Sequence, residues 1–157
     1  MTTTASVPTA IHRSDDALPF APIAPGVESK VSQVSISDGL WVVRSRMQPG
    51  YLAQTHRHTG PVYGFTLSGS WHYLESVDEV NRSGSYLFEP AGSVHTLHVP
   101  DDATEPADVW FAIWGANLNL AADGSVETVT DAAAMLAAYR WSCKKNGLGD
   151  PPVIVDP

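Results

Sequence analysis

Between about residues 27 and 114 the chain alternates short apolar segments with turn-forming residues. The segments are rich in β-branched and aromatic side chains, and glycine, proline, serine or aspartate lies between them. This pattern predicts short β-strands. A series of such strands at regular spacing is typical of an antiparallel sandwich or barrel. The predicted strands cover residues 31–36, 40–47, 51–58, 62–67, 70–75, 85–89, 95–99 and 109–114.

The pattern becomes helical after these strands. Leu136 and Tyr139 recur at helical spacing among alanines, so their side chains share one face of a helix that we expect to pack on the barrel. Thr130 or Asp131 can cap the start of this helix. The sequence therefore predicts one C-terminal helix over about residues 130–146.

The N-terminal stretch has neither pattern. Residues 1–18 are rich in Thr, Ser, Ala and Asp, a composition typical of poorly ordered termini. Residues 18–26 carry three prolines, which favour extended backbone. We therefore expect residues 1–26 to form a flexible, extended arm and residues 27–157 to form a single domain.

Composition and charge narrow the function classes. The 157 residues are 43% hydrophobic and 17% charged, as in a globular chain. The formal net charge of −8 argues against nucleic acid and anionic membranes as partners, because both need basic side chains at their phosphates. Cys143 is the only cysteine, which excludes an intramolecular disulfide and a thiolate metal cage. The sequence shows neither a signal peptide nor an apolar run of membrane-spanning length, so we expect a cytoplasmic protein.

Three histidines fall on two of the predicted strands. His56 and His58 are two residues apart, and on a strand this spacing places both imidazoles on one face. The same alternation turns Arg57 to the opposite face. His95 follows a Pro-x-Gly turn at residues 90–92, which can fold the next strand back toward the first pair. Three neutral imidazoles on one wall predict a site for a divalent transition metal with open coordination positions.

The segments around these histidines resemble the two motifs of the cupin superfamily. The chain fits the spacing of both motifs, except that Val62, or Tyr63 in the longer form, stands where the first motif has a glutamate. The resemblance implies an all-β cupin fold, which is a double-stranded β-helix or jelly-roll barrel. The matching residues are Gly50, His56, His58 and Gly69 in the first motif and Gly84, Pro90, Gly92 and His95 in the second.

A narrower resemblance, to the 2,4'-dihydroxyacetophenone dioxygenase family, extends from about residue 50 to residue 149. Members of that family are small cupins that hold non-haem iron on three histidines and cleave a C–C bond next to a carbonyl with dioxygen. The resemblance implies that His56, His58 and His95 bind Fe(II), and that an aromatic hydroxyketone and dioxygen are the substrates. The stretches that carry it are residues 56–58, 62–65, 69–75, 84–86, 89–97 and 146–149.

Three further residues are weaker candidates for the site. Glu89 lies six residues before His95, where the family also has a glutamate. Its expected role is to accept a hydrogen bond from a ligand imidazole or a metal-bound water, and the alternative is a carboxylate at the rim of the barrel. Glu75 is either a distant ligand or a surface carboxylate. Trp114 lies on a late strand of which one face should line the cavity, where an indole can stack on an aromatic substrate.

The other barrel histidines, His72 and His98, are expected to stay outside the metal site. His98 lies three residues after His95 and therefore faces the other side of its strand.

Several alternatives remain open. The chain can be a cupin that acts on another dicarbonyl or hydroxyketone, a zinc-binding sensor module like the cupin half of anti-sigma regulators, or a metal-binding module without catalysis. Residues 1–26 contain no cysteine and one histidine, which counts against the Cys/His zinc domain of those regulators. Zinc and nickel also bind three imidazoles, so a purified sample can carry either in place of iron. The proline-rich arm and the exposed sheet edges predict a homodimer or a higher homo-oligomer.

Overall fold

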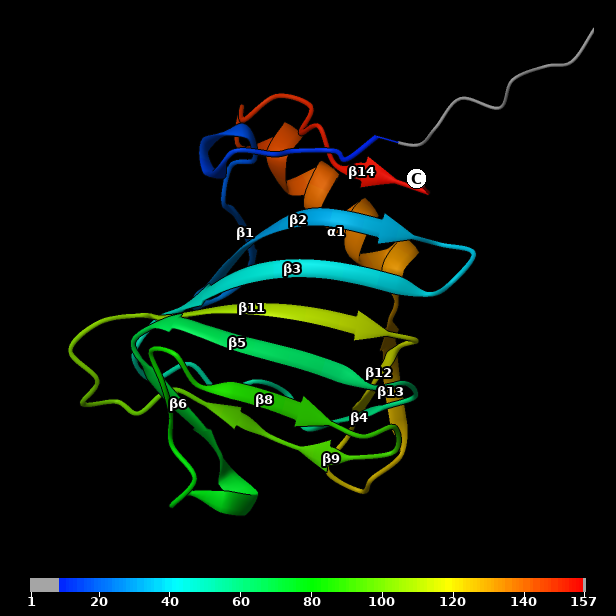
Figure 1. Cartoon of the computed structure of the whole chain (residues 1–157). Coiled ribbons are helices and arrows are strands. Elements are labelled where there is room, and N and C mark those ends of the chain that lie inside the picture. The colour runs from blue at the N-terminus through cyan, green and yellow to red at the C-terminus, as the bar shows by residue number, and fades with distance from the viewer. Residues whose placement is uncertain (1–8, 157) are drawn as a thin grey trace, which may run out of the picture.

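The computed structural model of the protein describes residues 9–156 (Figure 1). Within these residues the expected all-β fold with one C-terminal α-helix is confirmed. The larger sheet has seven strands in the order β1-β2-β3-β11-β5-β8, with β14 paired to β2. The bounds of its strands are Ala21–Ala24 (β1), Val27–Ser35 (β2), Leu40–Met47 (β3), Val62–Ser68 (β5), Tyr86–Glu89 (β8), Ala107–Trp114 (β11) and Ile154–Val155 (β14).

Two smaller sheets complete the barrel. One has the order β13-β12-β4-β9, and the other has the order β10-β6-β7. The bounds are His56–His58 (β4), Ser70–Tyr73 (β6), Asn81–Arg82 (β7), Val94–His95 (β9), Leu97–His98 (β10), Asn117–Leu120 (β12) and Val126–Thr130 (β13), with short 3-10 helices at Asp15–Ala17 (η1) and Leu74–Ser76 (η2). The four-stranded sheet lies opposite the larger one, because residues of β4 and β12 line the same cavity as residues of β3 and β11.

The structure differs from the predicted strands around the histidines. The strand expected at residues 51–58 is reduced to β4. Strands β12 and β13 are additional, since the sequence pattern did not reveal them. β12 pairs with one side of β4, and β9 pairs with the other. A strand as short as β4 depends on neighbours on both sides for its position.

Two groups of buried apolar side chains fill the molecule. The first lies between α1 and strands β1, β2 and β3 and includes Val31 and Trp41. The second includes Trp71 and Val99. Phe111 on β11 packs against both groups. Burying a large apolar side chain stabilises the fold by about 1.5–3 kcal/mol, so these groups supply most of the driving force.

The expected C-terminal helix is α1, Ala132–Lys145, which lies over β1 and β2 (Figure 1). Its start is capped by Asp131, whose carboxylate accepts a hydrogen bond from Ala134 N at 2.8 Å. The hydroxyl of Tyr139 donates to Pro19 O at 2.7 Å and so fastens the N-terminal segment to the helix. Neither α1 nor any other helix in the described part of the chain has the length and apolar character needed to cross a bilayer.

The N-terminal segment joins the larger sheet before residue 27. Asp15 lies 2.7 Å from Lys30 Nζ and 2.5 Å from Arg44 Nη1, and β1 pairs antiparallel with β2. The boundary expected at residue 27 therefore lies within a β-hairpin, and the expected arm contributes a strand to the sheet. The part of the arm at residues 1–8 lies outside the described residues.

Candidate metal centre

The three motif histidines lie on two adjacent strands. His56 and His58 are on β4, and His95 is on β9, where it is the register partner of His56. The three ring centroids are 4.8 to 5.0 Å apart, and one ring nitrogen of each residue lies within 4.8 Å of the others. Arg57 is exposed on the opposite face of β4. The structure therefore places the three imidazoles together, with no other side chain of β4 between them.

The Pro-x-Gly turn is joined to β4 by backbone hydrogen bonds. Gly92 N donates to His58 O at 2.8 Å, and His58 N donates to Ser93 O at 3.1 Å. Gly92 has a φ of 88°, a left-handed conformation that favours glycine. The backbone position of His95 relative to His58 is thus set by main-chain hydrogen bonds.

His56 is held in the form that binds a metal. Its Nδ1 lies 2.8 Å from Gln54 O. A carbonyl only accepts hydrogen bonds, so Nδ1 carries the proton and Nε2 keeps its lone pair. Burial lowers the pKa of His56 to about 4. The ring is therefore neutral near pH 7, with a bare nitrogen available to a transition metal.

Glu89 supplies a carboxylate in the place of the one that the first motif lacks. It ends β8 as the register partner of Val62 on β5. Its Oε2 lies 2.8 Å from His58 Nε2 and 3.1 Å from His95 Nε2. Burial alone would raise the pKa of Glu89, but its contacts with the two histidines outweigh burial and hold the pKa below its usual range. The carboxylate is therefore ionised at neutral pH.

The contacts of Glu89 Oε2 with the two imidazoles are close but are not aligned as hydrogen bonds. Among the described residues, the buried atoms Glu89 Oε2 and His95 Nε2 therefore lack a hydrogen-bond partner. Each buried polar atom without a partner costs about 1–3 kcal/mol. A cation held by the imidazoles would satisfy both atoms. Three neutral nitrogens with a carboxylate beside them are a donor set that fits a divalent transition metal.

Tyr73 is a site residue that the sequence reasoning missed. Its ring stacks on His95 with centroids 4.1 Å apart and planes at 15°, and its hydroxyl donates a hydrogen bond to Glu89 Oε1. Burial and the neighbouring charge of Glu89 raise the pKa of Tyr73, so the phenol keeps its proton and stays a donor. The sequence did contain a signal for the inward position of Tyr73. Tyr73 lies two residues after the buried Trp71 on β6, and residues two apart on a strand share a face.

A cavity of about 570 Å³ adjoins the histidines. His56, His58 and Glu89 form one part of its wall. Cavities of roughly 300–1,000 Å³ with few polar groups are typical sites for small molecules. Most of the remaining wall is apolar and includes Ile23, Val27, Trp41, Val43, Met47, Tyr51, Leu97, Phe111, Ile113 and Met135.

Strand β11 divides its aromatic residues between two faces. Phe111 and Ile113 line the cavity. Trp114 lies on the opposite face, where its ring packs edge-on against the exposed Tyr63 with centroids 5.7 Å apart. The expected aromatic wall of the cavity is therefore formed by Phe111 rather than by Trp114, because alternate residues of a strand face opposite sides.

Comparison with known proteins agrees with this architecture. Residues 9–106, more than half of the chain, match the family described as the ChrR cupin-like domain. The chain belongs to this cupin family. No curated protein matches it.

Solved structures share the cupin fold over most of the chain. A cupin-like protein of unknown function from Ralstonia eutropha JMP134 is 27% identical, with a TM-score of 0.88, covering 96% of this cupin and 94% of that chain. An acetylacetone dioxygenase from Acinetobacter johnsonii is 17% identical, with a TM-score of 0.73 and coverages of 90% and 97%. The anti-sigma ChrR of Rhodobacter sphaeroides, in complex with SigE, is 13% identical, with a TM-score of 0.53 and coverages of 64% and 52%. The last two likenesses concern the fold alone.

The candidate Glu75 and the two remaining barrel histidines, His72 and His98, lie outside the cluster. Glu75, in η2, accepts hydrogen bonds from Thr96 N and Thr96 Oγ1, both at 2.9 Å. It therefore anchors the backbone next to His95 and does not reach the imidazoles. His72 and His98 face each other on β6 and β10, with His98 Nδ1 3.4 Å from His72 Nε2.

Proposed function

We propose that this cupin is a non-haem Fe(II)-dependent dioxygenase that cleaves a C–C bond next to a carbonyl in an aromatic hydroxyketone. The observation that carries the proposal is the three-histidine cluster, two of whose members, His56 and His58, line an apolar cavity. Three neutral imidazoles leave coordination positions for a bidentate substrate and for dioxygen. The cavity volume suits one aromatic ring with a short side chain.

The walls of the cavity orient the substrate in this proposal. The aromatic ring packs against Trp41 and Phe111, and the two adjacent oxygens of the hydroxyketone point toward His56 and His58. Fe(II), when bound, supplies Lewis acidity at these oxygens and the reducing power that dioxygen needs. The apolar wall keeps the substrate in one orientation and excludes water from the reacting carbon.

Glu89 positions the imidazoles in this proposal. Its Oε2 lies against His58 and His95, and Tyr73 holds its other oxygen by a hydrogen bond. A carboxylate that is held at Oε1 and touches both rings through Oε2 restricts how the two rings can turn. Because its pKa lies below the usual range, Glu89 is a weak base, and in this proposal it orients the ligands rather than taking up a proton.

Oxygen uptake tests this function. The protein is loaded anaerobically with Fe(II), its iron content is measured, and it is mixed with 2,4'-dihydroxyacetophenone or, in parallel, with acetylacetone. We expect uptake with the aromatic substrate, matched mole for mole by formate release. Acetylacetone tests the related case of a dicarbonyl substrate, the class named for the Acinetobacter johnsonii enzyme. Iron-containing protein that consumes no oxygen with either compound would contradict the proposal.

A metal sensor without catalysis is the second candidate. The match to the ChrR cupin-like domain favours it. A sensor is expected to bind zinc at the same histidines and to change the hydrogen exchange of β4 and β9 on binding, with no oxygen uptake after iron loading. Catalytic turnover with either carbonyl substrate would exclude this alternative.

A further inference from the structure

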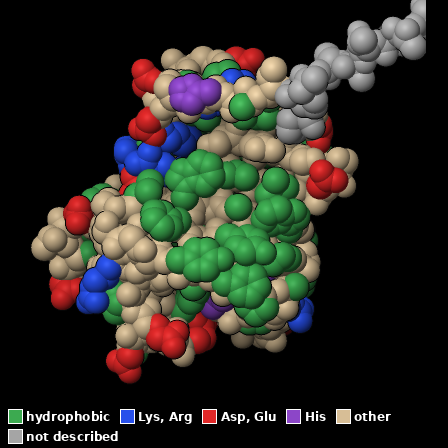
Figure 2. Space-filling model, in the orientation of Figure 1, with side chains coloured by type: hydrophobic (Ala, Val, Ile, Leu, Met, Phe, Trp, Pro, Cys, Tyr) green, Lys and Arg blue, Asp and Glu red, His purple; other side chains and the backbone are tan. Residues whose placement is uncertain are grey.

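The outer face of the larger sheet carries a continuous apolar surface (Figure 2). The outward-facing positions of β5 and β8 are all apolar, and Trp110 of β11 lies beside them. We define six of these residues as the aromatic face, and each of their side chains is between 37% and 65% exposed. They are Tyr63, Phe65, Leu67, Tyr86, Phe88 and Trp110.

Strand register makes this surface contiguous. Phe65 is the register partner of Trp110 on one side and of Tyr86 on the other. The next row pairs Tyr63 with Phe88, whose rings are 5.4 Å apart. Register partners on one face lie about 4.5–5.5 Å apart at Cβ, so the side chains within each row touch.

The size of the aromatic face suits a protein interface. An aromatic side chain has about 150–250 Å² of surface, so six large side chains at the observed exposures present on the order of 500 Å². This is near the upper end of roughly 300–600 Å² for the largest apolar patch of a monomer. A stable interface buries about 800 Å² per partner. An apolar centre of this size together with a polar rim would account for that area.

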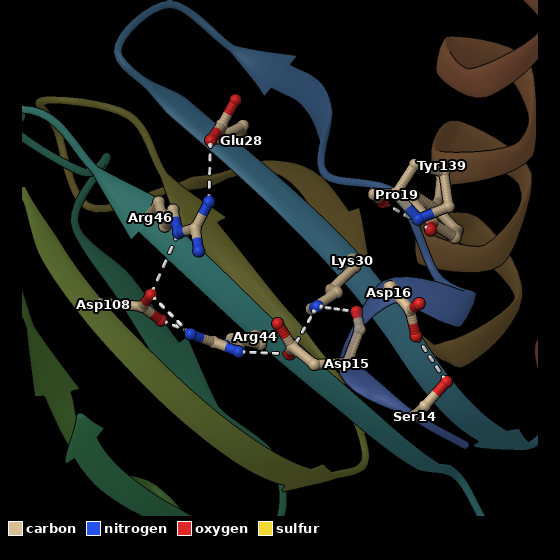
Figure 3. A network of polar contacts seen from close by, with 10 residues as sticks. All are labelled: Ser14, Asp15, Asp16, Pro19, Glu28, Lys30, Arg44, Arg46, Asp108 and Tyr139. Carbon is tan, nitrogen blue, oxygen red and sulfur yellow. Dashed lines mark hydrogen bonds and ion pairs between the residues drawn. The ribbon is translucent and has the colours of Figure 1, made fainter. Parts of the chain in front are cut away.

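The charged groups beside the aromatic face are already paired within the chain (Figure 3). Arg44 Nε lies 2.7 Å from Asp108 Oδ1, and Arg46 Nε lies 3.0 Å from Asp108 Oδ2. Arg44 and Lys30 also contact Asp15. These cations therefore leave little charge for an acidic partner such as nucleic acid, and the neighbouring surface has to be matched by apolar groups.

We propose that two copies of this chain pair through the aromatic face, sheet against sheet, across a two-fold axis. The net charge of −8 disfavours contact between copies over most of the surface. Strands β5 and β8 project no charged side chain from the aromatic face, so the same surface on two copies meets without like charges opposed. Two sheets packed in this way lie about 10 Å apart with their strands roughly 30° from parallel.

The pairing also covers the outward side chains of an edge strand. Among the described strands, β8 pairs with β5 alone, so it is an edge strand with two exposed aromatic residues, Tyr86 and Phe88. Exposed apolar edges promote uncontrolled association. A second copy over this face limits that association. This inference concerns assembly and stands whether or not the proposed oxygenase reaction is correct.

Sedimentation equilibrium, which measures the mass of the protein in solution, tests the proposal. Protein concentrations between about 1 and 100 μM cover typical homodimer affinities. We expect the wild-type protein to have twice the chain mass of 16.8 kDa. Phe65→Glu places a charge at the centre of the aromatic face and is expected to raise the dimer dissociation constant by at least ~100-fold. The matched control is Val129→Glu, a substitution of a residue on β13 that is 52% exposed and lies in another sheet. It should leave the dimer unchanged.

Each outcome of this experiment decides the question. A wild type that is still monomeric at about 100 μM, the upper limit of the test range, overturns the proposal. A dimer that persists in Phe65→Glu, or one that Val129→Glu also dissociates, overturns it too. Circular dichroism checks that Phe65→Glu is folded. If it is not folded, Tyr86→Ser at the exposed edge replaces it, with an expected rise in the dissociation constant of about 10-fold. An unchanged dimer in that variant also overturns the proposal.

Discussion

The two faces of the larger sheet are made from the same strands but have different surroundings. On the inner face, Val62, Ile113 and Glu89 are buried and adjoin the cavity or the histidines. On the outer face, the alternate residues of the same strands, such as Tyr63 and Phe88, form the aromatic face, and the charged cluster around Arg44 lies beside it. Both faces are rich in apolar groups, so hydrophobicity alone does not tell them apart. The difference lies in what each residue contacts within a single chain.

This difference has consequences for substitutions. Inner residues fit closely, as at Gly64, where a Cβ would meet the ring of Phe111 at 3.2 Å. A change there disturbs one folded chain at any protein concentration. Outer residues such as Phe65 have few partners until a second copy is present. Their substitution should therefore act through association, which depends on concentration.

The largest expected effect is a loss of metal affinity on replacing the inward-facing His95, compared with the outward-facing His98. His95→Ala removes one of the three proposed metal ligands and should lower metal affinity by more than ~100-fold, beyond the loss typical of a residue that only supports a ligand. If the proposed dioxygenase reaction is correct, oxygen uptake should disappear with the metal. His98→Ala, on the outward side of the neighbouring strand β10, is the matched control and should bind metal normally. Competition with a chromophoric chelator measures both affinities, and equal losses in the two variants would contradict the assigned site.

The next effect compares the two faces of the sheet directly. Ile113→Ala opens a cavity in the core and should lower the free energy of unfolding by about 2–4 kcal/mol. Phe65→Ala should cost less than about 1 kcal/mol in the monomer, because its side chain is half exposed. Urea unfolding at submicromolar protein measures both, and repeating it at high concentration should reveal an added loss for Phe65→Ala alone. Similar costs at both concentrations would remove the distinction between the faces.

A smaller effect concerns the carboxylate beside the imidazoles. Glu89→Gln keeps the shape of the side chain but loses its charge, and it should weaken metal binding by about 10–100-fold. Tyr73→Phe removes the hydrogen bond to Glu89 and should weaken binding by less than ~10-fold. The exposed Glu79→Gln serves as a control for the change in net charge. Isothermal titration with Zn(II) checks the order, and a Glu89→Gln protein with wild-type affinity would show that this carboxylate does not support the ligands.

The smallest effect lies in the charged cluster of the outer face. Burial raises the pKa of Asp108, but hydrogen bonds from Arg44 and Arg46 outweigh burial and hold the pKa below its ordinary 3.8. The ionised group therefore stabilises the fold above about pH 4, and this stabilisation is lost as the pH falls through the lower pKa of the folded state. Asp108→Asn should cost about 1–2 kcal/mol at pH 7.

Unfolding measured at several pH values checks this prediction. The wild type should lose more stability than Asp108→Asn between about pH 5 and pH 2, because only the wild type has the carboxylate to protonate. Glu28→Gln is the matched control. Its partner Arg46 is 3.8 Å away and both side chains are 38% exposed, so the change should cost less than about 0.5 kcal/mol. Parallel pH curves for the wild type and Asp108→Asn would contradict the assignment.

The sequence was sufficient for the parts of the fold that follow from local alternation. Strands β3, β5 and β11 and the helix α1 lie close to the predicted ranges because their apolar periodicity is strong. β12 and β13 were missed, since Asn117 and Asn119 are unusual in strands and β13 is largely exposed. β12 forms because β4 offers it an edge to pair with, and β13 pairs in turn with β12, which is information from elsewhere in the chain.

Site residues were predictable from the sequence where their positions depend on a single strand. They were less predictable where their positions depend on how strands pair. The spacing of His56 and His58 places them on one face, and the structure shows that arrangement. The role of Tyr73 depends on how β6 lies against β9 and β8, which no local pattern specifies. The orientation of Trp114 depends on which face of β11 meets the cavity, and that is decided by the pairing of β11 with β3 and β5.

The pairing of Val62 with Glu89 bears on how such proteins are recognised from sequence. Side chains that face each other across two strands lie so close that either can carry an acid to nearly the same place. An acid at either position would therefore lie beside the same imidazoles. A linear motif that requires the acid at one of the two positions overlooks a chain that carries it at the other.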